Sequence, residues 1–314
     1  MNKLKKIGLS ALAGSLVAMS VNAAELAITG SASISFSDTK QGKADRGNGF
    51  SMGDSINFNF TGETDSGLNV KVHYEFDGDV VDDYDLTLSN DMGTLVFNGS
   101  GTSGAFGAID DMTPNAYEES WDIVAGTPTV INGYSAANSF IYTSPSMSGV
   151  TFKTSYVNAN GLTTAGTATS YMDYAIMITP EAVEGLSIGF GIADSEQVVG
   201  TTTDEQTAYV KYAYGPVTAG YQLSSLDSSA ANGDQDSVAW GVSYAVSDNI
   251  SIAYNEHTLE TESTSDKDQE SSGISGSYTM GGMTLAGAMN SIDNVQGTDA
   301  NDFEGYEFTL SFAF

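Results

Sequence analysis

The carboxyl-terminal segment of this chain limits its fold more than any other part. Its last nine residues alternate between large apolar side chains and smaller or polar ones, and the chain stops on an aromatic carboxylate. The apolar positions are Tyr306, Phe308, Leu310, Phe312 and Phe314. In a soluble sheet such a strand would be an exposed edge prone to aggregation. In a closed membrane barrel it pairs with the first strand and turns its apolar face to lipid, so the terminus predicts a transmembrane β-barrel.

The amino terminus has the three parts of a secretory signal peptide. Three lysines precede an apolar stretch over residues 7–21, and a small-residue cleavage site ends at Ala23. We expect a signal peptide at residues 1–23 and a mature domain at residues 24–314. No later segment approaches the roughly 20 apolar residues that a spanning helix needs. The mature protein is therefore expected to be either secreted or an outer-membrane barrel, and in the barrel case the outer-membrane assembly machinery would recognise the terminal strand.

Composition narrows the classes of function. The chain has 40 acidic residues against 10 Lys and Arg, a formal net charge of −30. A nucleic-acid-binding face needs clustered Lys or Arg, so nucleic acid is excluded as an expected partner. No cysteine is present, which excludes thiolate metal sites and a cysteine nucleophile. Hydrophobic residues make up 40% of the chain, and they alternate with small or polar ones. This pattern favours a folded β protein over a disordered acidic chain.

Alternation with a period of two recurs along the whole mature chain and predicts sixteen strands. The expected strands lie at residues 25–37, 56–60, 68–76, 84–88, 95–97, 140–142, 150–156, 174–178, 186–192, 208–214, 217–223, 238–244, 250–254, 274–280, 283–289 and 306–314. An even number lets an antiparallel barrel close with both chain ends on one side.

The connections between these strands alternate in length. Short turns are expected at residues 62–67, 90–93, 145–149, 180–185, 215–216, 247–248 and 281–282. The other set, polar and mostly longer, runs over residues 38–50, 77–82, 99–137, 158–169, 194–205, 225–236, 257–270 and 291–303. Outer-membrane barrels place short turns toward the periplasm and long loops outside. The sequence thus predicts an all-β fold, a 16-stranded antiparallel transmembrane barrel.

The inner face of such a barrel is left with polar side chains. Sixteen strands leave an aqueous lumen rather than a packed core. The pore wall is expected to carry Lys71, His73, Glu75, Asp85, Lys153 and Lys211.

One connection, residues 99–137, is far longer than its neighbours and is third among the long loops. It begins with a glycine-rich segment and then combines acidic residues with aromatic ones. Its acidic positions are Asp110, Asp111, Glu118, Glu119 and Asp122. We expect this loop to fold into the lumen and these acids to form one side of a constriction.

These features together resemble a Gram-negative general porin of the alphaproteobacterial type. The resemblance rests on the signal peptide, the Ala24-Glu25-Leu26 start of the first strand, the sixteen segments, the long third loop and the terminal Phe314. It implies a homotrimer of independent pores in the outer membrane, each admitting small hydrophilic solutes and ions. It also implies acids on the loop facing a basic cluster on the wall, but this chain offers few basic residues there. We therefore expect cation preference.

The outer loops carry many more acids, among them Glu260, Glu262, Asp266, Asp268 and Glu270. Their carboxylates suit Ca²⁺ or Mg²⁺ and could bridge to the phosphates of lipopolysaccharide in the outer membrane. No stretch has the spacing of an EF-hand loop, and a solvated acidic surface remains the alternative. Apart from such ions, no cofactor is expected.

Two other classes of protein compete with the channel. An enzyme is not expected, because the chain has only two histidines and shows no Ser-His-Asp arrangement. A secreted or surface adhesin or lectin, binding calcium and sugar through the acidic loops, would also have a signal peptide and short alternating strands. The alternating connection lengths and the aromatic terminus count against the adhesin.

Overall fold

The computed structural model describes residues 25–41, 44–78, 80–122, 131–133, 137–158, 170–198, 201–262, 267–299 and 301–314. The expected signal peptide lies outside the described residues.

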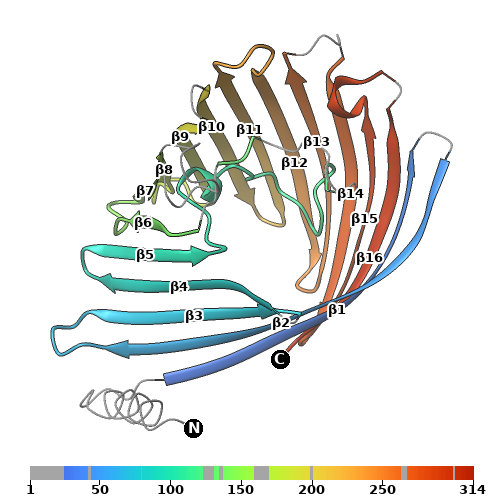
Figure 1. Cartoon of the computed structure of the whole chain (residues 1–314). Coiled ribbons are helices and arrows are strands. Elements are labelled where there is room, and N and C mark those ends of the chain that lie inside the picture. The colour runs from blue at the N-terminus through green and yellow to red at the C-terminus, as the bar shows by residue number, and fades with distance from the viewer. Residues whose placement is uncertain are drawn as a thin grey trace, which may run out of the picture.

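Sixteen antiparallel strands form in the described part of the chain, as predicted, and they close into one barrel. Their bounds are β1 Glu25–Gln41, β2 Ala44–Glu63, β3 Asn69–Asp77, β4 Val80–Asn90, β5 Gly93–Ser100, β6 Ser139–Thr143, β7 Val150–Val157, β8 Tyr171–Ile178, β9 Leu186–Val198, β10 Thr201–Tyr214, β11 Val217–Ser228, β12 Gln235–Ser247, β13 Ile250–Thr261, β14 Gln269–Met280, β15 Met283–Asp293 and β16 Phe303–Ala313. Each strand pairs with its sequence neighbours (Figure 1). No described helix is long and apolar enough to cross a membrane.

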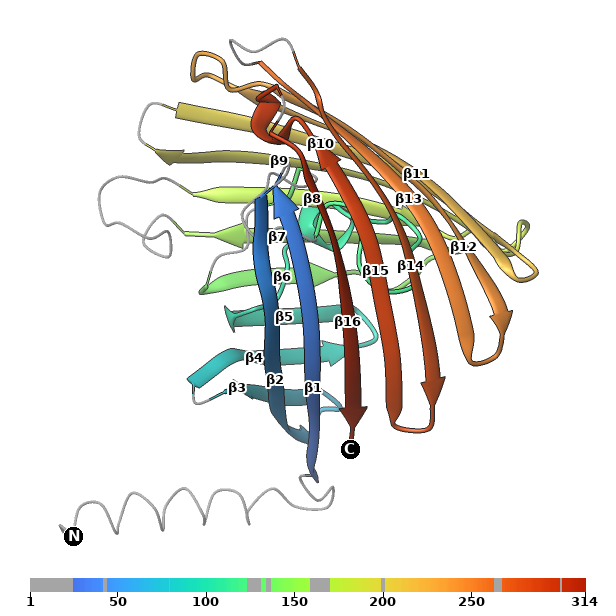
Figure 2. The same ribbon diagram turned by 90° about the vertical axis from the view of Figure 1, so that its right-hand side faces the viewer.

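The last strand closes the barrel on the first. Strand β16 pairs with β1 from Ser31 opposite Ala313 to Gln41 opposite Phe303. Beyond these pairs, Gly30 and Phe314 exchange backbone hydrogen bonds of 2.7 and 2.9 Å. Figure 2 shows β1 and β16 side by side, with the C-terminus at the same end of the barrel as the start of β1.

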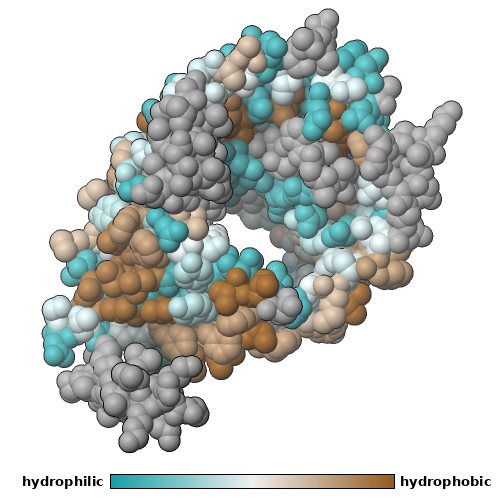
Figure 3. All heavy atoms as spheres, in the orientation of Figure 1, coloured by the Kyte–Doolittle hydropathy of each residue, from teal (hydrophilic) through white to brown (hydrophobic). Residues whose placement is uncertain are grey.

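Side chains alternate between the two faces of the wall. The outward face carries exposed apolar residues on every part of the sheet, including Phe308, Phe312 and Phe314 of the terminal segment, and Phe314 is 77% exposed. Leu310 and Tyr306 share that face with intermediate exposure. The inward face is polar or small, as on β13, where Asn255 and His257 are buried. This inside-out pattern is what a wall between lipid and an aqueous lumen requires. An opening within the ring of strands is visible in Figure 3.

Several connections on the long-loop side are shorter than the sequence predicted, and three of them are mostly replaced by strand. Strands β1 and β2 pair as far as Gln41 and Ala44. Strands β3 and β4 pair as far as Asp77 and Val80, and β9 and β10 reach Val198 opposite Thr201. The expected loops at residues 38–50, 77–82 and 194–205 are therefore largely strand. Their polar side chains hide the alternation of two, but backbone hydrogen bonds do not need apolar side chains.

Glycines with positive φ close several of the tight turns, and one gives a test of barrel stability. Gly149 has φ +82°, and a Cβ there would lie 2.2 Å from the carbonyl oxygen of Thr179. We expect Gly149→Ala to lower the urea midpoint of barrel unfolding. The free energy of unfolding should fall by at least the roughly 1–2 kcal/mol that a left-handed backbone conformation costs an L-residue. Gly215 has φ +58° and no heavy atom within 4 Å of its Cβ position. Gly215→Ala therefore measures the backbone cost alone, and an equal effect of both changes would contradict the steric argument.

Candidate functional site

The third loop enters the barrel, as the sequence predicted. It leaves β5 at Ser100, forms the short helix η1 (Phe106–Ala108) and is described over residues 101–122, 131–133 and 137–138. Figure 1 shows this segment inside the ring of strands. Its hydrogen bonds reach β8, β11, β13, β15 and β16.

The first anchor of the loop is the buried carboxylate of Asp173 on β8, which has no exposed surface. Its Oδ2 accepts hydrogen bonds from the backbone N–H of Phe106 at 2.9 Å and from the hydroxyl of Tyr171 at 3.2 Å. Its Oδ1 accepts one from the backbone N–H of Ser155 at 2.8 Å and another from the Ser155 hydroxyl. A Cβ on Gly104 would come within 2.5 Å of Oδ2, so the loop backbone passes close to the carboxylate. One side chain thus fixes the entry of the loop.

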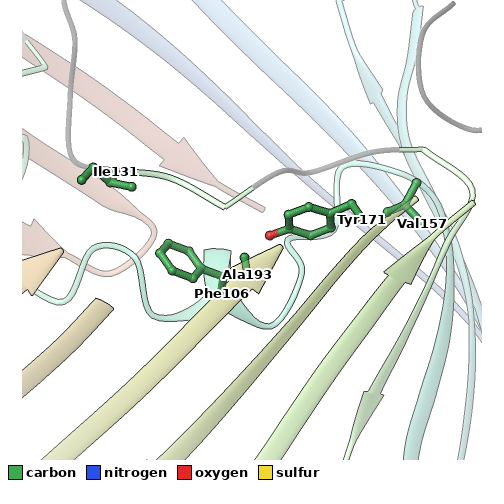
Figure 4. Packing of buried hydrophobic residues seen from close by; sticks show 5 residues of the cluster. All are labelled: Phe106, Ile131, Val157, Tyr171 and Ala193. Atoms are coloured by element: carbon green, nitrogen blue, oxygen red, sulfur yellow. The ribbon is translucent and has the colours of Figure 1, made fainter. Parts of the chain in front are cut away.

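Apolar packing secures the same part of the loop. Figure 4 shows η1 and a later loop residue packed against β7, β8 and β9 through Phe106, Ile131, Val157, Tyr171 and Ala193. A second buried cluster consists of Ala105, Ile109, Ala175 and Tyr209. Both clusters lie inside the barrel. Apolar burial here fixes the loop to the inner wall and does not form a conventional hydrophobic core.

A glutamine on β11 holds the middle of the loop. Gln222 is buried, and its Nε2 donates to the carbonyl oxygens of Ile109 at 2.8 Å and Asp110 at 2.7 Å. Its Oε1 accepts from the backbone N–H of Met112 at 2.7 Å. The side-chain amide of Gln222 therefore fixes the backbone on both sides of Asp110 and Asp111.

The far end of the loop is tied to β13 and β15. The backbone N–H of Ser120 donates to Oδ1 of Asn255 at 2.7 Å, and Nδ2 of Asn290 donates to the carbonyl oxygen of Glu119 at 2.7 Å. The ring of Trp121 packs on His257 with centroids 4.8 Å apart. These contacts hold the second acidic group close to the wall.

Tyr117 carries the loop across to the closing strand. Its hydroxyl contacts Oγ1 of Thr309 at 2.6 Å and donates to the carboxylate of Glu307. Burial and the hydrogen bond to Glu307 raise the pKa of Tyr117. The phenol therefore remains a neutral donor, and it links the loop to β16.

Two of the predicted acids, Asp110 and Asp111, are largely buried between loop and wall. Burial raises the pKa of Asp110 to about 7, and repulsion from Asp111 adds to the rise. Burial raises the pKa of Asp111 to about 6, opposed by a hydrogen bond from Thr113 and by the charge of Lys211. Both carboxyl groups therefore change charge near neutral pH.

The other three predicted acids form a cluster. One carboxylate oxygen from each of Glu118, Glu119 and Asp122 lies within 4.8 Å of the others. Burial and the proximity of Asp122 raise the pKa of both Glu118 and Glu119. The structure thus brings all five predicted acids onto one docked segment, and burial raises the pKa of four of them, Asp110, Asp111, Glu118 and Glu119.

The predicted basic residues do not gather into one cluster. Lys153 on β7 donates to the carbonyl oxygen of Ser103 at 3.3 Å, and Lys211 on β10 lies near enough to Asp111 to lower its pKa. Lys71 lines a shallow pocket with Glu25 and Thr61 toward the short-turn end of β2 and β3. The lysines are therefore spread around the wall.

The remaining predicted wall residues, His73, Glu75 and Asp85, lie on β3 and β4. His73 is in contact with Asp85, with Nδ1 to Oδ2 at 3.2 Å, and its Nε2 lies 2.6 Å from Oδ1 of Asn57. Glu75 accepts a hydrogen bond from Ser55 on the neighbouring strand. Two carboxylates and one imidazole thus share this patch, which adds no strong positive field.

Sequence reasoning did not identify the side chains that hold the loop. These are Gln222, Asn255, Asn290, Glu307 and the buried carboxylate of Asp173. Each is a polar residue at an inward position of its strand. The alternation of inward and outward positions was the only signal in the sequence for these residues. It did not show which inward residues the loop would contact.

A serine and a histidine do meet, but not in a catalytic arrangement. Oγ of Ser237 lies 2.9 Å from Nε2 of His257. The His257 ring is buried under Trp121, and its Nδ1 has no hydrogen-bond partner. A general base needs access to substrate and a group that orients it, so this pair serves packing.

A closed barrel of sixteen strands with a loop docked inside its polar lumen defines a membrane channel architecture. A model of the family described as Gram-negative porin matches residues 8–297. The chain belongs to this family, and it is a protein of the outer membrane. No curated protein matches the sequence.

Solved structures show the same fold at low sequence identity. An anion-selective porin from Comamonas acidovorans is 15% identical with a TM-score of 0.73, covering 93% of this chain and 100% of that one. The trimer form of OmpT, an outer membrane protein of Vibrio cholerae, is 12% identical with a TM-score of 0.71, covering 93% and 99%. A mutant of the Rh. blastica porin is 15% identical with a TM-score of 0.67, covering 92% and 100%.

Proposed function

We propose that this porin is a water-filled channel for the passive diffusion of small hydrophilic solutes and ions, and that it prefers cations. The observation that carries the proposal is the docking of five carboxylates on one loop inside the barrel. Fixed carboxylates in a narrow, low-dielectric passage attract cations and focus the field. The dispersed lysines supply no matching positive cluster.

The selectivity of a relative does not transfer to this chain. The Comamonas porin is described as anion-selective, and at 15% identity it shares the fold alone. Selectivity in this chain must then come from its own lumen residues. The acids of the third loop favour the opposite preference.

We also propose a homotrimer with a cleaved signal peptide at residues 1–23. The trimer form of the Vibrio cholerae protein supports the assembly. The exposed apolar face of β16, which closes the barrel, would serve as the signal for outer-membrane assembly. Lipid contacts on the remaining outer wall follow from the same exposed apolar face.

The direct test is the reversal potential of residues 24–314 in a planar bilayer across a potassium chloride gradient. We expect stable conductance steps. The reversal potential should have the sign that a cation-selective channel gives across this gradient. A reversal potential of the opposite sign would show that the channel prefers anions and that the lysines set its selectivity. That result would contradict the proposal. Folded protein that gave no conductance would contradict the channel itself.

Neutralising the loop acids should remove the preference. In the variant Asp110→Asn, Asp111→Asn, Glu118→Gln and Glu119→Gln, the cation-to-anion permeability ratio is expected to fall about tenfold at low salt, the lower end of what a focused field supplies. The matched control neutralises Asp227, Asp236, Glu260 and Glu270, four exposed acids outside the lumen. An equal fall in the control would show that general surface charge, not the loop, sets selectivity.

A further inference from the structure

A polar pocket lies on the inner face of the barrel at its short-turn mouth. It measures about 380 Å³ and is formed at the ends of β1 to β4. The sequence neighbours Leu26 and Phe60 belong to the exposed apolar outer face, so the polar side chains between such residues point into the lumen. The polar side chains that line the pocket include Glu25, Thr61, Glu63, Asn69, Lys71 and Thr87. None of them anchors the third loop, so the constriction does not account for this set.

The strand register sets the spacing of the charged groups in this pocket. Glu25 pairs with Thr61, and Thr61 pairs with Lys71, so Glu25 and Lys71 are two strands apart on one face. Neighbouring strands lie about 4.7–4.9 Å apart, which puts these two positions about 9.5 Å apart. Glu63 pairs with Asn69, two residues from Lys71 along β3, and diagonal neighbours of this kind lie about 7–8 Å apart. One ammonium group therefore faces two carboxylates across a gap.

The opposite charges of the pocket are not paired with one another. Among the residues that the structure describes, neither Lys71 nor Glu25 takes part in an ion pair. On the neighbouring strands, the hydroxyl groups of Thr61 and Thr87 flank Lys71 on both sides. Hydroxyl groups donate and accept hydrogen bonds. The pocket thus offers separated charges with neutral polar groups between and beside them.

The pattern of signs indicates which class of solute fits this pocket. Lys71 attracts a simple anion, but Glu25 and Glu63 repel it. A simple cation meets the reverse arrangement. A solute with a carboxylate at one end and an ammonium group at the other satisfies both sides at once, through charge-assisted hydrogen bonds. The pocket is therefore complementary to a zwitterion.

The distance between the charges selects the length of the zwitterion. An α-amino acid carries both charges on one carbon atom, which is too short to reach both sides of the gap. An extended chain spans about 3.3–3.6 Å per residue, so the two ends of a dipeptide lie about 7 Å apart. That length matches the diagonal from Glu63 to Lys71, and the peptide group between the ends would meet the hydroxyl group of Thr61. A volume of 380 Å³ is within the range of small-molecule sites.

We propose that this pocket binds dipeptides at the periplasmic exit of the channel. The carboxylate of the dipeptide binds to Lys71, and its ammonium group lies between Glu25 and Glu63. The inference rests on the proposed channel function and names a class of solute for it. The acids of the third loop attract the ammonium end of an entering dipeptide, and the pocket then binds both of its ends.

The experiment measures the single-channel current of residues 24–314 in a planar bilayer at increasing concentrations of glycylglycine. A bound dipeptide obstructs the mouth and lowers the current, and the concentration of half effect gives the dissociation constant. Two further probes each lack one charge, since glycylglycine amide has no carboxylate and N-acetylglycylglycine has no ammonium group. Wild type is expected to bind glycylglycine about tenfold more tightly than either probe, a difference of about 1.4 kcal/mol.

Variants of the pocket should change the preference in opposite directions. Lys71→Gln is expected to weaken glycylglycine binding about tenfold and to make the amide the preferred probe. The double variant Glu25→Gln and Glu63→Gln should instead prefer N-acetylglycylglycine. Lys40→Gln is the matched control, because it removes one exposed lysine of β1 outside the pocket, and it should bind all three probes as wild type does.

Three outcomes would overturn the proposal. These are a wild-type current that no probe lowers, equal binding of all three probes, and probe preferences that stay the same in the two pocket variants. Conductance without any probe shows that each variant is a folded channel. Loss of dipeptide binding is therefore distinguishable from failure of the proposed channel function.

Discussion

Replacing Asp173 by alanine is expected to release the third loop from the wall and to raise the single-channel conductance. The carboxylate accepts hydrogen bonds from Phe106, Ser155 and Tyr171 in a place without solvent exposure. Each buried donor left without a partner costs about 1–3 kcal/mol. Losing several at once makes the docked position of the loop unfavourable relative to a loose one, and a loose loop obstructs the lumen less.

The variant Asp173→Asn separates anchoring from charge. Asparagine keeps an acceptor oxygen at the same place while it removes the charge, so its conductance should stay closer to that of wild type. Digestion of the folded protein by a glutamate-specific protease gives a second readout, since Glu118 and Glu119 lie in the docked loop. Rapid cleavage is expected in Asp173→Ala only. If alanine and asparagine raised conductance equally and neither became protease-sensitive, the anchor assignment would be wrong.

The strands could be predicted from the sequence because lipid on one side and water on the other force a period of two. Where the outward residues are polar, the same signal fails, as over the paired ends of β1 and β2 near Gln41 and Ala44. There the backbone ladder continues without an apolar face. Hydrogen bonding between neighbouring strands, not residue type, decides where these strands end.

The acidic loop was predictable from its length and composition, but its anchors were not. Gln222 and Asn255 are inward polar residues like many others on the barrel. Which of them meets the loop depends on strand register and on the path of residues 101–122, and both are properties of the closed barrel. The alignment of Asp194, Asp204 and Asp227 also follows from register. From the sequence alone Asp194 and Asp204 belong to one expected loop, residues 194–205, and Asp227 belongs to the next, residues 225–236.

Cation preference is expected to rise with pH between about 5 and 8 because the pKa of Asp111 lies at about 6 and that of Asp110 at about 7. Deprotonation adds two negative charges to the docked loop over this interval. Lys211 favours the charged form of Asp111, while Asp122 opposes it, and Glu205 on β10 lies near Asp110. The measurement is the reversal potential at low salt, where screening is weak.

The same groups couple loop docking to pH with the opposite sign. A carboxyl group whose pKa is raised in the docked state binds a proton more tightly there than when free, so docking weakens as pH rises from about 4 to about 7. Protease sensitivity of the loop should therefore increase along with cation preference. In the Asp110→Asn and Asp111→Asn variant both responses should become smaller, while Glu118 and Glu119, whose pKa values are also raised, still titrate. A His73→Gln background removes the lumen imidazole from the comparison. The control variant Asp204→Asn and Asp227→Asn, outside the lumen, should keep the wild-type response. A pH response that persisted unchanged without Asp110 and Asp111 would show that other groups govern the lumen charge.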